Sequence, residues 1–248
     1  LPWREDTAAY RVWVSEIMLQ QTRVEAVKPF FERFIKALPD VQALSEAPED
    51  ELLKLWEGLG YYNRVRNMQK AARVIVSEYG GDFPADYEKL LSLPGLGHYT
   101  AGAVSSIAFG IPMPAVDGNV LRVLSRVTAS YEDVLKQSVK TAMEAEVKKI
   151  IPADRAGDFN QALIEIGAIV CVPNGKAKCE ICPLAFLCEA YKKGIVDELP
   201  KKKVKRERRI EDRTILILKE GDRVGIRKRP SKGLLAGLYE LPGLEGHL

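Results

Sequence analysis

The chain has 248 residues, of which 46% are hydrophobic and 29% charged, and its formal net charge is +3. This length suits one large domain or two ordinary ones, with a core that needs no cross-links. No apolar run approaches the ~18 residues that span a bilayer, and the first residues lack the pattern of a secretory signal. We therefore expect a soluble cytoplasmic protein. The small charge permits an acidic partner but does not require one.

The first two hundred residues repeat apolar side chains at the three- and four-residue spacing of helices. Prolines and glycines such as Pro39, Gly58 and Gly80 separate these runs. No run alternates as a strand would. The pattern predicts a mostly α fold, with helices over 11–21, 24–38, 50–59, 64–80, 87–93, 100–110, 120–127, 138–150 and 158–171.

The composition changes near residue 200. Seven of the nine residues at 201–209 are Lys or Arg, which is typical of an exposed linker. Two short β-rich runs then flank Gly221 and Asp222, a hairpin signal. The remaining stretch of about 35 residues is too short for an independent domain. We expect it to be the start of a second, α+β domain.

All four cysteines lie within eighteen residues, as Cys171, Cys179, Cys182 and Cys188. Disulfides are not expected in a reducing compartment. Zinc usually takes two Cys-x2-Cys pairs, whereas this segment has one such pair with a single cysteine on each side. The spacing favours a [4Fe–4S] cluster, with zinc as the alternative. Lys176 and Lys178 would make the surface of this loop basic.

Residues 92–104 read as a helix, a Pro-Gly-x-Gly hairpin and a second helix. Gly95 and Gly97 allow the sharp turn, and the helix that follows offers free N–H groups to a phosphate. An ordinary helical turn is the alternative. Asp117 precedes another helix, where it is expected to act as N-cap and to be kept ionised by the N–H groups it accepts from.

Glu16 lies among apolar neighbours in VSEIMLQQ. A carboxyl group in such surroundings is costly unless it has a partner or a catalytic role. Burial raises its pKa, so that it could hold a proton near neutral pH and act as a general acid. A solvated glutamate on a helix face is the alternative.

The L-P-G-x-G hairpin, the V-D-x-N-V-x-R-V segment and the clustered cysteines resemble the helix-hairpin-helix DNA glycosylases of the endonuclease III superfamily. LPWR, VSEIMLQQTRVE and WEGLGYYNRVRN resemble its adenine-specific MutY branch. IRKRPSKGLLAGLYELPG is similar to the opening of the MutT-like (Nudix-fold) domain of that branch. The resemblance implies a six-helix domain at 12–116, an iron–sulfur helical domain from 1–11 and 117–196, a basic linker at 197–211 and a truncated MutT-like domain at 212–248.

The resemblance also implies catalytic roles. Glu16 would protonate a ring nitrogen of adenine and then help to position water, while Asp117 would stabilise the oxocarbenium-like sugar by charge or by a transient covalent bond. Asn119 would lie beside Asp117. Trp3 and Arg4 match the adenine pocket of the family.

Further residues would contact the DNA, since the base must leave the duplex. Gln21 would lie near the vacated position and Tyr61 would wedge beside the opposite base. The other expected contacts are to the DNA backbone, from Arg64, Arg66, Gly95, Gly97, His98, Lys176 and Lys178.

Tyr99 occupies the position where the related glycosylase/lyases have a lysine that forms a Schiff base. It therefore predicts a monofunctional enzyme. One departure from the superfamily is the first cysteine gap, which is seven residues here and usually six.

The predicted function is an adenine DNA glycosylase of base excision repair, acting on adenine opposite 8-oxoguanine or guanine in double-stranded DNA. We expect a nucleoid-associated monomer. An endonuclease III-like glycosylase/lyase is the first alternative, but it should have Lys at position 99. A non-enzymatic iron–sulfur DNA-binding or redox-sensing protein would have no need of both Glu16 and Asp117. A Nudix hydrolase would need a glutamate-rich helix that these residues lack.

Overall fold

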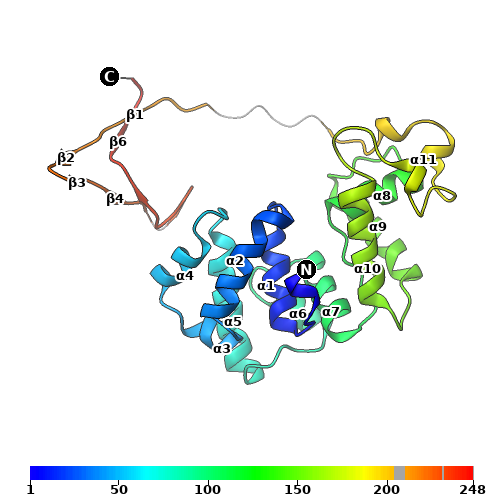
Figure 1. The fold of residues 1–248 in the computed structure, drawn as a ribbon, viewed down its shortest axis with the longest axis horizontal. Helices are drawn as coiled ribbons and strands as arrows, with labels where there is room; N and C mark the ends of the chain where they lie inside the picture. Colours follow the sequence, from blue (N-terminus) through cyan, green and yellow to red (C-terminus); the bar gives the residue numbers. More distant parts are fainter. Residues whose placement is uncertain (204–209, 231, 248) are drawn as a thin grey trace. The chain divides into compact units, whose positions relative to one another are not determined.

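The computed structural model describes residues 1–203, 210–230 and 232–247. The chain divides into two compact units, residues 1–203 and 204–248 (Figure 1). The first unit is helical and the second contains short strands, so the predicted fold class is confirmed. The predicted domain boundaries inside the first unit stay a prediction. The predicted basic linker falls partly on 204–209, which lie outside the described residues.

The helical unit begins with a short 3-10 turn, η1 (Pro2–Arg4), and ends with another, η4 (Val196–Glu198). The α-helices between them are α1 (Ala9–Leu19), α2 (Val24–Ala37), α3 (Val41–Glu46), α4 (Glu49–Trp56), α5 (Asn63–Tyr79), α6 (Tyr87–Ser92), α7 (His98–Phe109), α8 (Gly118–Val127), α9 (Gln137–Ile150), α10 (Ala156–Glu165) and α11 (Glu189–Lys192).

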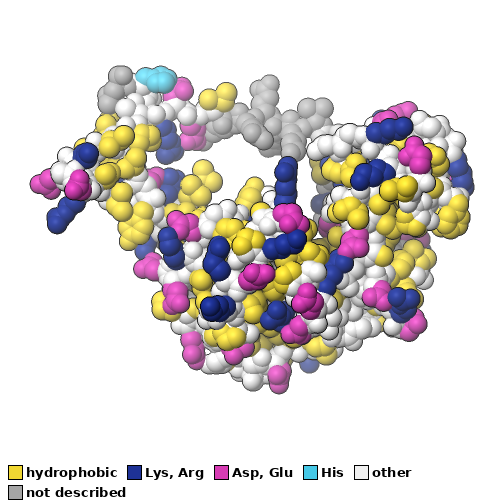
Figure 2. All heavy atoms as spheres, viewed as in Figure 1, with side chains coloured by type: hydrophobic (Ala, Val, Ile, Leu, Met, Phe, Trp, Pro, Cys, Tyr) yellow, Lys and Arg dark blue, Asp and Glu magenta, His cyan; other side chains and the backbone are white. Residues whose placement is uncertain are grey.

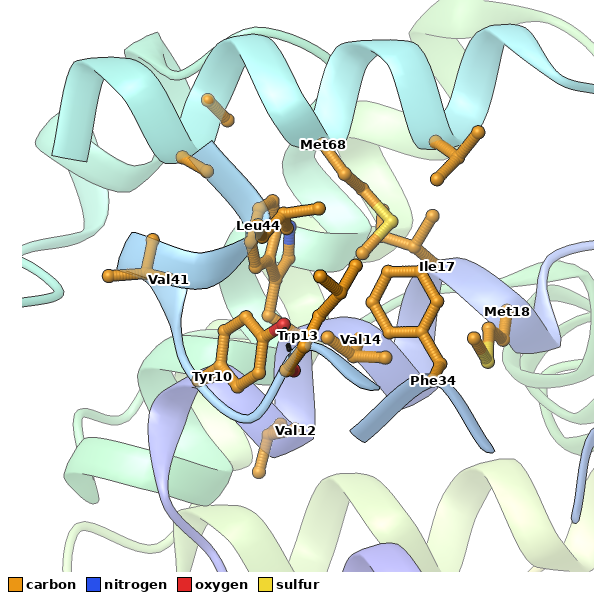
Figure 3. Close-up of a cluster of buried hydrophobic side chains, with 14 of the residues drawn as sticks. Tyr10, Val12, Trp13, Val14, Ile17, Met18, Phe34, Val41, Leu44 and Met68 are labelled. Carbon is orange, nitrogen blue, oxygen red and sulfur yellow. Dashed lines mark hydrogen bonds between the residues drawn. The ribbon is translucent and has the colours of Figure 1, made fainter. Parts of the chain in front are cut away.

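The centre of the larger hydrophobic core is α1, of which every residue from Val12 to Met18 is buried. A helix that is apolar all round is stable only when other elements cover it on every side. Residues from α2, α3 and α5 pack against it, among them Phe34, Leu44 and Met68 (Figure 3). Glu16 is the one ionisable side chain in this buried run, so the fold places a carboxyl group where water is largely excluded.

A second, smaller core forms around α8, with Val120 and Val123 packed against Val147 of α9 and Leu163 of α10. Between the two cores lies α7, which packs on both α1 and α10. Its buried face is made of small residues such as Ala101, Gly102 and Ser105, so neighbouring backbone approaches closely. Helix α7 therefore fixes the position of α10 relative to α1.

The run expected as one helix over 158–171 changes its winding. It is α-helical to Glu165 and π-helical over η2 (Ile166–Val170). Gly167 allows η2 to pack closely against α8, because a Cβ at position 167 would lie 2.6 Å from the Cβ of Asn119. The wider turn brings the backbone of η2 against the start of α8, and such turns often occur at functional sites.

Two short helices have no counterpart among the predicted runs, α3 and α11. Neither segment was recognised from its apolar spacing, and helices as short as these depend on tertiary packing for their stability. Asp40 caps α3 by accepting from the N–H of Ala43 at 2.8 Å. In the cysteine segment a further 3-10 turn, η3, spans Cys179–Ile181.

In residues 210–230 and 232–247, the described part of the second unit, the strands form three antiparallel pairs. The predicted hairpin is confirmed, since β2 (Lys219–Glu220) pairs with β3 (Arg223–Val224) around Gly221. The other pairs are β1 (Arg213–Ile215) with β6 (Gly243–Glu245) and β4 (Arg227–Lys228) with β5 (Tyr239–Glu240). Most of these strand residues are exposed, so the described part of this unit has little core of its own.

In the described part of the chain, no helix combines the length and the apolar character that crossing a membrane requires. On the face of the helical unit shown in Figure 2, Lys and Arg side chains are interspersed with Asp and Glu. This agrees with the small net charge, and it means that any affinity for an acidic partner depends on local features.

Candidate active site and cysteine cavity

Glu16 and Tyr99 form the central contact of the candidate active site. The Tyr99 hydroxyl on α7 donates a hydrogen bond of 2.5 Å to Oε2 of Glu16 on α1. Burial is the main reason why the pKa of Glu16 rises from 4.5 to about 7, and the charge of Asp117 adds to the rise. The Tyr99 hydrogen bond and the charge of Arg4 act in the opposite direction. Glu16 can therefore exchange a proton near neutral pH.

Tyr99 keeps its own proton. Burial, followed by the carboxylate charges of Glu16 and Asp117, raises the pKa of Tyr99 well above 10. The phenol is thus a neutral hydrogen-bond donor across the physiological range. It can orient the Glu16 carboxyl group without competing for its proton.

Asp117 is the N-cap of α8, as the sequence predicts. Its Oδ1 accepts from the backbone N–H groups of Asn119 and Val120, each at 2.8 Å, and its Oδ2 accepts from Nδ2 of Asn119 at 2.7 Å. Burial nevertheless raises the pKa of Asp117, because desolvation outweighs these hydrogen bonds and the nearby charge of Arg122. With three donors against one for Glu16, Asp117 is the better supported of the two as an anion.

Arg122 connects the Asp117 cap to the cysteine segment. Its Nη2 donates to Oδ1 of Asn119 at 2.8 Å and to the Gly167 carbonyl at 2.7 Å, and its Nε donates to the Cys171 carbonyl at 2.7 Å. One turn later, Nη1 of Arg126 lies 3.1 Å from Sγ of Cys171. Both guanidinium groups are buried, so they hold this connection in a region with little water.

All four cysteines line one small, partly open cavity, which we call the cysteine cavity. Its other walls are largely apolar and include Val123, Ala177 and Leu184, with Arg126 at one side. Burial and the three other thiols raise the pKa of Cys179. Four thiolates would repel one another in such a cavity unless a cationic group were bound, which is the charge pattern expected for an iron–sulfur centre.

Within the described residues, no three His, Cys, Asp or Glu side chains are grouped closely enough for a single metal ion. The two lysines expected on this loop are exposed, Lys176 near Glu180 at 3.7 Å and Lys178 at the wall of the cysteine cavity. Both are thus available to a partner in solution.

Residues 14–152 match the HhH-GPD superfamily of base excision DNA repair proteins. The chain is 36% identical to the adenine DNA glycosylase of Buchnera aphidicola subsp. Schizaphis graminum, over 99% of this chain and 70% of that protein. It is also 36% identical to the Homo sapiens adenine DNA glycosylase, over 98% of this chain and 54% of that protein. The chain belongs to the adenine DNA glycosylase family. It is a DNA N-glycosylase.

Two solved structures are similar to this glycosylase in fold. The structure of a thermostable thymine-DNA glycosylase is similar with a TM-score of 0.68 and 32% identity, over 78% of this chain and 88% of that one. A non-covalent endonuclease III–DNA complex is similar with a TM-score of 0.65 and 29% identity, over 76% of this chain and 86% of that one.

Two residues that the sequence predicts at the DNA, Gln21 and Tyr61, have unusual backbone conformations in the glycosylase. Gln21 and Tyr61 both have left-handed backbone angles, with φ of 60° and 49°, which push their side chains out of the helical path. Tyr61 is 63% exposed, although large aromatic side chains are usually covered. Strain at exposed residues of this kind often marks a functional surface.

The hairpin of the glycosylase is tight, as predicted. Gly95 has a φ of 79°, and a Cβ there would lie 2.6 Å from the Cβ of Asn67. Gly97 is the N-cap of α7, so the first N–H groups of that helix are free of side-chain caps. His98 is exposed, and its Nδ1 lies 2.8 Å from the Tyr87 hydroxyl.

The two arginines expected at phosphates have other partners in the glycosylase. The terminal nitrogens of Arg64 donate to five backbone carbonyls, those of Ile17, Met18, Gln20, Leu59 and Gly60. Arg64 therefore ties the end of α1, beside Gln21, to the loop before Tyr61, and it has no terminal donor directed at a phosphate. Arg66 forms an ion pair with Glu49 at 2.9 Å.

In the LPWR segment of the glycosylase, Trp3 packs inward while Leu1 and Arg4 are exposed. Trp3 is only 5% exposed and its ring meets the edge of Phe31 at 5.4 Å between centroids. Arg4 forms an ion pair with Glu165 at the end of α10, and its charge also acts on Glu16. The indole of Trp3 thus belongs to the core, while Arg4 lies near enough to Glu16 for its charge to lower the pKa of that carboxyl group.

Sequence reasoning assigned no role to Arg122 or Arg126. A signal was present, because two arginines four residues apart in the apolar run VLRVLSRV lie on the face of α8 that also contains Val123 and Val127. Buried arginines need acceptors, and the cysteine segment supplies them.

Proposed function

We propose that the protein removes adenine from mispairs in double-stranded DNA, opposite 8-oxoguanine or guanine, and leaves an abasic site. The observation that supports this most is the arrangement of Glu16, Tyr99 and Asp117, which pairs a carboxyl group poised to hold a proton with one supported as an anion. The relatives named adenine DNA glycosylase support adenine as the base that is removed. Glycoside hydrolases likewise use two carboxyl groups, one protonated and one ionised.

The proposed reaction breaks the bond between C1′ of the sugar and the adenine ring. Protonated Glu16 donates its proton to a ring nitrogen, so that adenine leaves as a neutral base with the bonding electrons. The sugar becomes cationic, and the charge of Asp117 stabilises it from the N-terminus of α8. The Glu16 carboxylate then accepts a proton from water as the oxygen of that water bonds to C1′. Tyr99 orients Glu16 throughout.

Adenine must leave the duplex to reach these groups, and the bent DNA must be held. The exposed Tyr61 and Gln21 are proposed to occupy the space within the duplex. The hairpin at Gly95 and Gly97 and the free N–H groups of α7 are proposed to bind phosphate, with His98 beside them. Arg66 and the lysines of the cysteine loop are further candidates, and such contacts position the enzyme without specifying the base. We propose a monomer that acts on nucleoid DNA in the cytoplasm.

A [4Fe–4S] cluster is the proposed occupant of the cysteine cavity, held by Cys171, Cys179, Cys182 and Cys188. The fit rests on four thiols that share one largely apolar cavity with a guanidinium at its wall. When bound, the cluster would hold the loop of Lys176 and Lys178 in a fixed shape. Through Arg122, the cysteine segment is also linked to Asn119, whose side chain donates to Asp117.

Metal analysis tests the proposed cluster. The purified protein is expected to be brown, with about four iron atoms per chain and no stoichiometric zinc. Removing Cys182 by Cys182→Ser should release most of the iron and lower the melting temperature. One zinc and no iron per chain would contradict the proposed cluster, and zinc would become the assigned metal.

The substrate is tested with duplexes that place adenine opposite 8-oxoguanine, guanine, cytosine and thymine. Under single-turnover conditions, adenine should be released fastest opposite 8-oxoguanine and guanine. A mispair is easier to open than the Watson–Crick pair of adenine with thymine, which contributes to the slow release expected opposite thymine. Equal rates on all four duplexes would contradict recognition of the mispair. Release of an oxidised pyrimidine in place of adenine would support the endonuclease III-like alternative.

The presence of Tyr99 predicts whether the DNA strand is cleaved after the base has left. A neutral phenol cannot form a Schiff base, so the strand should stay intact until heat or alkali cleaves the abasic site. Borohydride should trap little covalent complex. The assay compares base release with strand nicking in one reaction, and nicking at the rate of base release would show a lyase.

A further inference from the structure

A buried asparagine on α10 hydrogen-bonds the segment that leads into Asp117. Asn160 is 1% exposed. Its Nδ2 donates to the Met113 carbonyl at 2.8 Å, and its Oδ1 accepts from the Ala115 N–H at 3.1 Å. These partners precede Asp117 by four and two residues. A side chain with a donor and an acceptor at one end is needed here, and a hydrophobic side chain would leave two buried backbone groups without partners.

The same amide also contacts α7. Nδ2 of Asn160 donates to Oγ of Ser106 at 2.8 Å. Two glycines bring the backbones together at this point. A Cβ on Gly102 of α7 would lie 2.0 Å from the Pro114 carbonyl oxygen, and a Cβ on Gly157 of α10 would lie 2.9 Å from the Ser106 carbonyl oxygen. The segment before Asp117 and α10 therefore both rest directly on α7.

Helix α7 also carries Tyr99, which donates a hydrogen bond to Glu16 of α1. Ser106 follows Tyr99 by seven residues, which is about two helical turns and places both on one side of α7. Tyr99 bonds Glu16, and Ser106 bonds Asn160. Asn160 thus joins α7, which orients Glu16 through Tyr99, to the segment that leads into Asp117.

We propose that Asn160 is a positioning residue that sets the separation between the carboxyl groups of Glu16 and Asp117. It acts through the backbone at 113–117 and touches neither substrate nor carboxyl group. The proposal deepens the proposed function and rests on it. A displacement of about 1 Å between reacting groups can lower a rate by roughly a hundredfold, so a modest shift of this segment has a measurable effect.

The test compares Asn160→Leu with Gln69→Met. Gln69 on α5 is a matched control, because it is also a buried amide and its Nε2 donates to two backbone carbonyls, those of Leu44 and Ala47, at the end of α3. Both variants should lower the melting temperature. Only Asn160→Leu should lower the single-turnover rate of adenine release, by about tenfold or more. Its affinity for a duplex with a non-cleavable adenine analogue should stay within about threefold.

The pH dependence of the single-turnover rate of adenine release supplies a second readout, which a simple loss of protein stability would not shift. The groups that act on Glu16 are Tyr99 from α7, Arg4 from η1 and Asp117. If Asp117 moves away, the carboxylate charge that helps to keep the Glu16 proton is weakened. The alkaline limb of the profile should then shift to lower pH in Asn160→Leu and stay in place in Gln69→Met.

Ser106→Ala provides a milder variant should Asn160→Leu not fold. It removes one acceptor of Asn160 and should lower the rate by a smaller factor with the same shift of the alkaline limb. Equal losses of rate in Asn160→Leu and Gln69→Met would overturn the proposal, as would unchanged rates in both Asn160→Leu and Ser106→Ala.

Hydrogen exchange separates this inference from the proposed function. In Asn160→Leu, or in Ser106→Ala to a lesser degree, the backbone amides of Asn119 and Val120, which donate to Asp117, should exchange faster together with that of Ala115. Unaltered exchange at Asn119 and Val120 would overturn the positioning role. Absence of adenine release by the unmodified protein would overturn the proposed function alone, because exchange does not depend on activity.

Discussion

Replacing Glu16 by Gln is expected to lower the single-turnover rate of adenine release by roughly 10²- to 10⁴-fold, the usual contribution of a general acid. Glutamine fits the same space and can still accept the Tyr99 hydrogen bond, but it has no proton to donate to the base. The affinity for mispaired DNA should change little. A rate near that of the unmodified protein would show that Glu16 is not the proton donor.

Two further measurements test the protonation of Glu16. With a pKa of about 7, the unmodified enzyme should lose activity as pH rises through this value, because the carboxyl group loses its proton. The Tyr99 hydrogen bond lowers this pKa, so Tyr99→Phe should move the alkaline limb to higher pH. An alkaline limb that does not move in Tyr99→Phe would contradict the role of Tyr99 in tuning Glu16.

The stability of the Glu16→Gln variant should change in the direction opposite to its activity. The folded protein binds a proton at Glu16 more tightly than the unfolded chain, so its free energy of unfolding falls as pH rises from about 4.5 to about 7. The variant lacks this loss and should be more stable at pH 8, by up to about 3 kcal/mol at about 1.4 kcal/mol per pKa unit. Chemical denaturation at pH 5 and pH 8 measures the difference, which should be small at pH 5.

Replacing Asp117 by Asn is expected to lower the rate by at least about a hundredfold, a loss typical of removing one preorganised electrostatic partner of a transition state. The Asn side chain keeps an oxygen that can accept from the N–H groups of Asn119 and Val120, so α8 keeps its cap. What it loses is the negative charge next to the developing sugar cation. The affinity for DNA should be retained.

Asp86→Asn is the matched control for that variant. Asp86 caps α6 in the same way, accepting from the Lys89 N–H at 2.9 Å, but it lies on the surface away from Glu16. The same chemical change there should leave the rate within about twofold while altering stability by about 1 kcal/mol or less. Similar rates for the Asp117→Asn variant and this control would place the catalytic charge elsewhere.

Local patterns in the sequence were sufficient for much of the fold and part of the site. The spacing of apolar residues predicted the long helices, and Gly95 and Gly97 predicted the hairpin, because these features depend on neighbours within a few residues. Asp117 was predicted as an N-cap for the same reason, since its partners are two and three residues away. The four cysteines could be grouped because they lie in one short segment.

Contacts between distant residues required the tertiary structure. Glu16 and Tyr99 are 83 positions apart, and nothing local in either helix states that a phenol will meet the buried carboxyl group. Arg64 resembles an exposed cation in the sequence, yet the loops around it supply five carbonyl acceptors that turn it inward. Trp3 is expected at the base pocket from the sequence, and only the tertiary structure showed that its ring packs against Phe31 in the core.

The sequence by itself therefore determined which residues can perform the chemistry: a carboxyl group in an apolar helix, a capped aspartate and four grouped thiols. Only the tertiary structure decided how they are arranged. Burial sets the pKa of Glu16, and it depends on helices α2, α3, α5 and α7 closing around α1. The physical reason is that desolvation and hydrogen bonding depend on distances in space, whereas a sequence pattern records only distances along the chain.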